Sequence, residues 1–117
     1  QYTHARIKSL LAKAEYTAKS ASLKDGEMLP VELEMILLLA KYPAEIEIAA
    51  KAYSPASLAN YLYELAKLFN KFYHEVPPIV KTEAGETKQF RLNLSKKTAD
   101  IIHSGMLILG ITSPERM

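Results

Sequence analysis

Residues 54–75 read SPASLANYLYELAKLFNKFYHE, and the chain is organised around them because they predict one long amphipathic helix. Ser54 suits the N-cap, and Pro55 suits the first helical position, where its missing N–H costs nothing. Large apolar residues recur at helical spacing and form one stripe: Leu58, Leu62, Leu65, Phe69 and Phe72. This stripe predicts the core, so a function is expected on the polar and tyrosine-bearing surface of the helix.

Four further helices are expected on the same grounds, at residues 1–21, 30–42, 44–52 and 90–109. Turn and proline signals separate them: Asp25-Gly26, Pro43 and the run Val76-Pro77-Pro78. No segment reads as a strand, and no repeat of fixed period is visible. The sequence therefore predicts an all-α bundle of about five helices, in a single domain of residues 1–117.

Two of these helices carry expectations about packing. The buried face of 30–42 is expected to comprise Leu33, Ile36, Leu37 and Ala40, and Leu38 and Leu39 are expected to widen it. The apolar side of 90–109 is expected to include Leu94, Ile101, Ile102, Met106 and Leu109. Gly105 inside this helix costs about 1 kcal/mol relative to alanine, so it predicts a close helix–helix approach. Gly110 is expected to end the helix.

Composition excludes several classes of protein. The chain of 117 residues has no cysteine, so it has neither a disulfide framework nor a cysteine-based zinc site. Its three histidines are scattered, and no metal site is expected. No apolar run approaches the roughly 18 residues of a membrane span, and residues 1–16 do not resemble a signal peptide. A cytoplasmic setting without a membrane partner is expected.

Charge is distributed unevenly, although the formal net charge is only +2. Residues 1–24 are mostly basic and residues 25–50 mostly acidic. A basic helix face can meet phosphates. Judged from the residues alone, however, ordinary solvated charge on helices that complement one another is the favoured interpretation.

The residues that remain for function indicate binding. No Ser/His/Asp set, glycine-rich phosphate loop or HExxH motif is present, so we expect no catalysis by this chain alone. Tyr2 and Arg6 lie one helical turn apart, an arrangement that suits stacking on a base and pairing with a phosphate. The alternative is a tyrosine packed at the edge of the core beside an arginine in water. His4 lies on the apolar side and is expected to be structural.

Three segments carry a resemblance to a known family: QYTHAR at 1–6, ANYLYELAKLFNKFYHE at 59–75 and LGITSPERM at 109–117. Together they resemble the C-terminal anticodon-binding (DALR) domain of arginyl-tRNA synthetases, class I enzymes that join arginine to its tRNA with ATP. The resemblance implies a helical domain that grips the anticodon stem-loop of arginine tRNA. It also implies a fragment of a longer synthetase, whose catalytic domain would lie upstream and would use ATP. The abrupt start of the first helix agrees with a fragment.

The resemblance also implies roles for particular residues. Tyr2, Arg6 and Tyr73 match residues that face the anticodon loop, and Met117 matches a C-terminal residue that approaches it. Asn60 and Asn70 are interpreted as supporting contacts. If RNA binds here, Tyr2, Arg6 and Tyr73 should be exposed together. A helical protein–protein interaction domain without an RNA partner is the alternative, and it should show a contiguous exposed apolar patch. The related helical domain of another synthetase is a further alternative.

Overall fold

The computed structural model describes residues 2–23, 26–52 and 55–112, and it contains helices and no strand in these ranges. The helices are α1 (Tyr2–Lys13), α2 (Pro30–Ala40), α3 (Tyr42–Ala52), α4 (Pro55–Glu75) and α5 (Glu86–Thr112). The all-α prediction is therefore confirmed. None of the described helices combines the length and the apolar character needed to cross a membrane.

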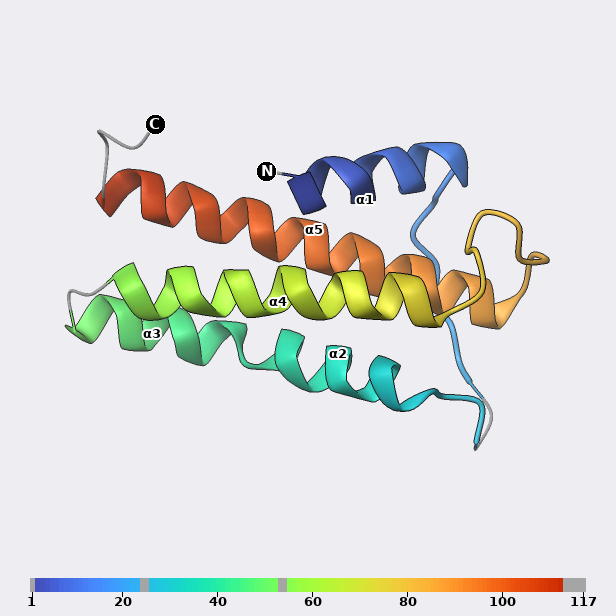
Figure 1. Ribbon diagram of the computed structural model, residues 1–117, viewed down its shortest axis with the longest axis horizontal. Coiled ribbons are helices and arrows are strands. Elements are labelled where there is room, and N and C mark those ends of the chain that lie inside the picture. The colour runs from blue at the N-terminus through green and yellow to red at the C-terminus, as the bar shows by residue number, and fades with distance from the viewer. Residues whose placement is uncertain (1, 24–25, 53–54, 113–117) are drawn as a thin grey trace.

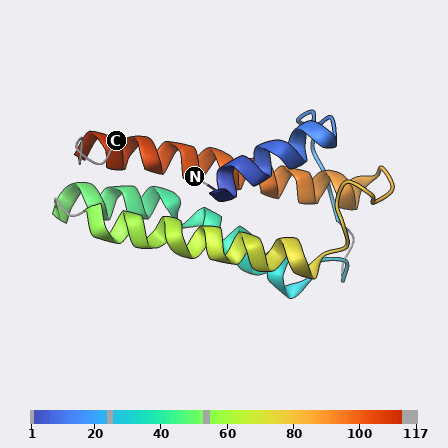
Figure 2. The same ribbon diagram turned by 45° about the horizontal axis from the view of Figure 1, so that its top comes forward.

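The two longest helices, α4 and α5, run side by side in opposite directions through the middle of the molecule (Figure 1). The short helices lie on either side of this pair. α1 packs along α5, whereas α2 and α3 follow one another along α4 (Figures 1 and 2). The molecule is elongated, 45 × 28 × 23 Å. α1 also makes a few contacts with α4. Side chains of α1 and α4 can therefore touch one another, although α1 packs mainly on α5.

The predicted stripe of α4 forms the core of the bundle. Five large apolar side chains on one face are buried: Leu58, Leu62, Leu65, Phe69 and Phe72. α4 begins at Pro55 as expected, and Ser54, the expected N-cap, lies outside the described residues. Tyr61, on the same face, is also buried, and its hydroxyl donates to the carbonyl oxygen of Leu38 at 2.7 Å.

The prediction for α1 was wrong about its length, because the helix ends at Lys13 and does not continue to residue 21. Glu15 takes a left-handed conformation, with φ of 52°. The N–H of Tyr16 then reaches the carbonyl of Leu11, and the N–H of Glu15 reaches that of Ala12. These two bonds form a Schellman motif, which closes a helix by satisfying its last carbonyls. Glycine usually occupies the left-handed position, so the sequence carried no stop signal.

The prediction for the buried face of α2 was wrong at most of its central positions, although Leu39 is buried and Ile36 and Leu38 pack against the core in part. The face that meets the core comprises Val31, Glu32, Met35 and Leu39. Leu33 and Leu37, expected inside, are 49% and 57% exposed, and Ala40 is also exposed. The error arose because one buried position carries a carboxylate. Glu32 is fully buried and pairs with Arg91 of α5, and the pattern of apolar residues does not reveal such a pair.

α5 begins at Glu86 and runs to Thr112, so it starts four residues earlier than the expected 90. Gly110 lies inside the helix and does not end it, and Met106, expected on the apolar side, is 45% exposed. The close approach predicted at Gly105 is confirmed. A Cβ atom there would lie 2.7 Å from Cδ1 of Leu62, so α4 and α5 meet where α5 has no side chain.

Candidate functional site

Arg6 connects α1 to α4 at the centre of the candidate site. Its Nη1 donates a hydrogen bond to Oδ1 of Asn70 at 2.9 Å. Its guanidinium carbon lies 5.2 Å from the ring centroid of Tyr2 and 4.9 Å from that of Tyr73. Both distances are within the roughly 6 Å over which a cation and an aromatic face attract one another. The guanidinium is therefore held between two tyrosine rings, and Asn70 positions it.

Helical spacing explains how four side chains converge here. Tyr2 and Arg6 are four residues apart on α1, and Asn70 and Tyr73 are three apart on α4, so each pair shares a face. Ile7 and Leu10 are buried beside this face of α1 and hold the helix on the bundle. The cluster thus stands on two helices that are both held in the bundle, α1 by α5 and α4 by its own buried stripe.

Exposure differs among the members of the cluster. The ring of Tyr2 is 69% exposed, whereas Arg6 and Tyr73 are half-buried. Tyr73 also packs on Phe69, with ring centroids 6.1 Å apart. The expectation that all three would be exposed together is met fully by Tyr2 and in part by the other two. Tyr2 consequently offers the most open aromatic face of this cluster.

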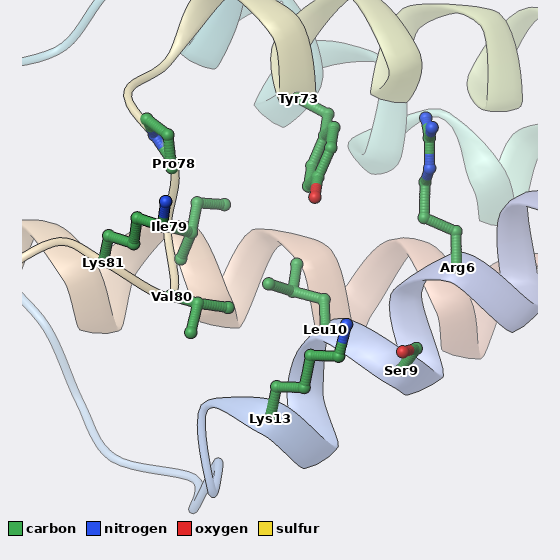
Figure 3. Close-up of a pocket in the computed structure, with 9 residues that line it drawn as sticks. All are labelled: Arg6, Ser9, Leu10, Lys13, Tyr73, Pro78, Ile79, Val80 and Lys81. Atoms are coloured by element: carbon green, nitrogen blue, oxygen red, sulfur yellow. The ribbon is translucent and has the colours of Figure 1, made fainter.

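A hollow of about 560 Å³ adjoins Tyr73, as the close-up in Figure 3 shows. α1 forms one side of it with Arg6 and Lys13, and residues 78–81 form another. We call this hollow the α1–loop groove. The sequence did not predict Lys81 as a site residue. It lies in a polar segment, and no pattern in that segment indicates that the chain turns back and brings this lysine beside the end of α1.

Two residues of the predicted site are not brought into this cluster. Asn60 is exposed on α4, ten residues before Asn70, which is about 15 Å along a helix axis. Met117 lies outside the described residues. The cluster in the described structure therefore contains four of the six predicted residues: Tyr2, Arg6, Asn70 and Tyr73.

His4 lies on the other side of α1 and stacks on His103 of α5, with ring centroids 5.7 Å apart. Burial lowers the pKa of His4, and the nearby charges of His103 and Lys8 lower it further. The neutral imidazole is thus favoured in the folded protein. This arrangement agrees with the structural role that was expected for His4.

An exposed apolar surface is present on α2, outside the Arg6 cluster. Leu33 and Leu37 are one turn apart, and both are about half exposed. A second hollow, of about 310 Å³, lies between α2 and α5, where Ile36 and Phe90 contribute to its walls. α4 and α5 lie between α2 and α1 (Figure 1). The molecule therefore carries an aromatic and cationic surface on α1 and an apolar surface on α2.

Comparison with known proteins gives one consistent result. Residues 1–117 match the family described as the DALR anticodon binding domain. The arginine–tRNA ligase of Flavobacterium psychrophilum is 45% identical over 117 residues, which are 100% of this chain and 19% of that protein. The arginine–tRNA ligase of Parabacteroides distasonis is 42% identical over 128 residues, covering 100% of this chain and 20% of that protein. The chain thus spans about a fifth of the length of these relatives.

Proposed function

The chain belongs to the DALR anticodon-binding domain family, and we propose from this premise that it binds the anticodon stem-loop of arginine tRNA. In this proposal it acts as one domain of a cytoplasmic arginine–tRNA ligase. The relatives that carry this name are about five times as long as the chain. The chain's task is to hold the tRNA, while another domain of the ligase joins arginine to it with ATP.

The observation that carries the proposal is the guanidinium of Arg6 between Tyr2 and Tyr73. A base that leaves its own stack can lie on an aromatic face, and each such contact contributes about 1–3 kcal/mol. Sequence-specific recognition of RNA mostly targets loops whose bases can be splayed in this way. An anticodon loop is such a target, and the outer face of Tyr2 is open to it.

Arg6 has two tasks in this proposal. Its charge attracts the phosphates of the loop, and its planar group continues the aromatic surface between the two rings. Asn70 acts as a positioning residue, because its side-chain oxygen holds the guanidinium at 2.9 Å. Lysine could supply the charge but not the planar stacking surface, so arginine is needed at this position.

We propose that the domain distinguishes one anticodon from another through polar groups that hydrogen-bond to the edges of the bases. A base whose hydrogen-bonding edge finds no partner in the complex costs about 1–3 kcal/mol, which is enough to reject it. In this proposal Met117 is a further contact of the loop and Asn60 is a supporting one, as the resemblance to the family implies. Neither belongs to the Arg6 cluster, so their contribution is a separate part of the proposal.

A second candidate partner is favoured by the exposed leucines of α2. Leu33, Leu37 and the hollow between α2 and α5 provide the kind of apolar surface that marks a protein contact. We propose the rest of the ligase as its occupant, since the relatives extend well beyond the matched segment. The alternative is that the chain is a helical interaction domain without an RNA partner, and that this surface binds another protein.

Substitutions in the Arg6 cluster test the proposed function. Tyr2→Ala, Arg6→Lys and Tyr73→Ala should each weaken binding of a hairpin RNA with the anticodon stem-loop of arginine tRNA, by about five- to a hundredfold for a lost stack. Leu37→Ala is the matched control, because it removes an exposed apolar side chain of α2 that does not belong to the Arg6 cluster. Fluorescence anisotropy gives the affinities, and circular dichroism verifies that each variant is folded. Unchanged affinity in all three cluster variants would contradict the proposal and favour the interaction domain.

A further inference from the structure

We propose that the α1–loop groove is a phosphate-binding subsite, in which Lys13 and Lys81 hold the backbone of the nucleotide next to the base at Tyr73. The ligand is a phosphodiester of single-stranded RNA. This inference rests on the proposed function, because it assumes that an RNA loop reaches Tyr73. It adds two lysines to the site and gives them a role that differs from that of the aromatic residues.

The shape of the groove is the first support. Its volume of about 560 Å³ lies within the roughly 300–1,000 Å³ of ordinary small-molecule sites. Leu10 and the buried Ile79 contribute apolar walls, and Tyr73 points toward the space from α4 (Figure 3). A nucleotide linked to a base stacked near Tyr73 would enter this space without any rearrangement of the helices.

The charges around the groove are the second support. Arg6, Lys13 and Lys81 all line it, and none of the described residues in its walls is acidic. Another hollow lies between the segment that precedes α2 and the segment that leads into α5. Its walls are acidic, because Glu27, Glu83 and Glu86 line it. The net charge of the whole chain is only +2. Three cations around one hollow therefore direct an anion to this place on a nearly neutral protein.

The loop that carries Lys81 is held in a defined conformation, which is the third support. The N–H of Lys81 donates to the carbonyl of Pro78 at 3.2 Å, and the hydroxyl of Thr82 donates to the same carbonyl at 2.9 Å. Nζ of Lys88, on α5, donates to the carbonyl of Val80 at 3.3 Å. Ile79 is only 2% exposed and anchors the turn in the core. Lys81 is thus presented from a built turn opposite α1.

Phosphate contacts have a signature that separates them from base contacts. Each lysine that neutralises a phosphate displaces a counterion, so affinity for a single strand falls with salt, with a slope of about −0.7 per contact on logarithmic axes. Phosphate contacts position the nucleic acid but carry no sequence information. Lys13 and Lys81 should therefore contribute to salt dependence and not to the choice of anticodon.

The test measures binding of the arginine tRNA anticodon hairpin, and of the same hairpin with a changed anticodon, over a range of salt concentrations. Lys13→Ala and Lys81→Ala should each weaken binding of both hairpins by the same factor. Each should make the salt slope shallower by about 0.7, and the double variant by about 1.4. The ratio of the two affinities should stay as in the unsubstituted chain. Lys41→Ala is the matched control, since Lys41 is exposed between α2 and α3.

The outcomes separate this inference from the proposed function. If Tyr73→Ala weakens binding but the two lysine variants behave like Lys41→Ala, the groove inference fails and the proposed function stands. If the lysine variants change the slope while Tyr73→Ala has no effect, the groove binds RNA without the proposed stacking site. A change in the affinity ratio would assign the lysines to base recognition and overturn the inference. Absence of RNA binding by the unsubstituted chain would overturn both.

Discussion

Replacing Arg91 by methionine is expected to destabilise the bundle severely, although the residue lies outside the proposed RNA site. Nε of Arg91 donates to Oε2 of Glu32 at 2.8 Å, and the two side chains are 8% and 0% exposed. Oε1 of Glu32 also accepts the N–H of Leu29 at 2.8 Å, which completes the start of α2. This pair connects α2 to α5 across the core, so both helices depend on it.

The magnitude follows from burial. Removing one partner of a buried ion pair leaves an uncompensated charge, which costs about 3–5 kcal/mol. Arg91→Met and Glu32→Leu should each cost about this much. Replacing both partners by apolar residues is often nearly neutral, so the double variant should lose only the hydrogen bond from Leu29, about 1 kcal/mol. The coupling between the two positions is therefore several kcal/mol.

Urea denaturation followed by far-ultraviolet circular dichroism measures these free energies of unfolding. Lys96→Ala is the matched control, because Nζ of Lys96 lies 2.7 Å from Oδ1 of Asp100 in an exposed pair of similar length. An exposed helix pair contributes about 0.3–0.5 kcal/mol. The contrast between two pairs of nearly equal length isolates the effect of burial. Costs below about 1 kcal/mol for both single variants, with an additive double variant, would show that the buried pair does not hold α2 on α5.

Three other perturbations test the packing. The lowered pKa of His4 means that the unfolded chain binds a proton more readily than the folded protein, so stability should fall as pH drops below about 6.5. His103→Gln removes one of the charges that lower the pKa of His4, so the loss of stability at acidic pH should be smaller in this variant. Thermal melts of both proteins between about pH 7.5 and about pH 5 measure the difference. Gly105→Ala should destabilise by about 1 kcal/mol despite its better helix propensity, since overpacking against Leu62 costs about 1–3 kcal/mol. Burial raises the pKa of Tyr61 to about 12, so its hydroxyl should ionise only near that pH in a spectrophotometric titration.

The buried face of a helix could be predicted from the sequence where large apolar side chains recur at helical spacing on one face only. On α4, every member of the predicted stripe is buried, because bulky leucines and phenylalanines leave one possible inner face. On α2, leucines surround the helix, and the inner face was decided by the pairing of Glu32 with Arg91, 59 residues away. α1 ended early because Glu15 adopts a conformation usually reserved for glycine, while the alanines beyond Lys13 are compatible with either structure.

The candidate site could be predicted only where its residues are neighbours on one helix or match the family. Helical spacing alone is enough to place Tyr2 and Arg6 on one face of α1. The approach of Asn70 and Tyr73 to Arg6 depends on how α1 packs, and spacing along the chain cannot provide it. Lys81 could not be predicted at all, because its position depends on a turn anchored by the buried Ile79.

We propose that this domain recognises the anticodon of arginine tRNA. The most direct measurement compares the affinity of the 117-residue chain for the native anticodon hairpin with its affinity for a hairpin of changed anticodon, at one salt concentration. We expect binding that is tighter for the native hairpin by at least about tenfold, or about 1.4 kcal/mol. Equal affinity for the two hairpins would contradict it and would leave only a basic surface that attracts RNA of any sequence.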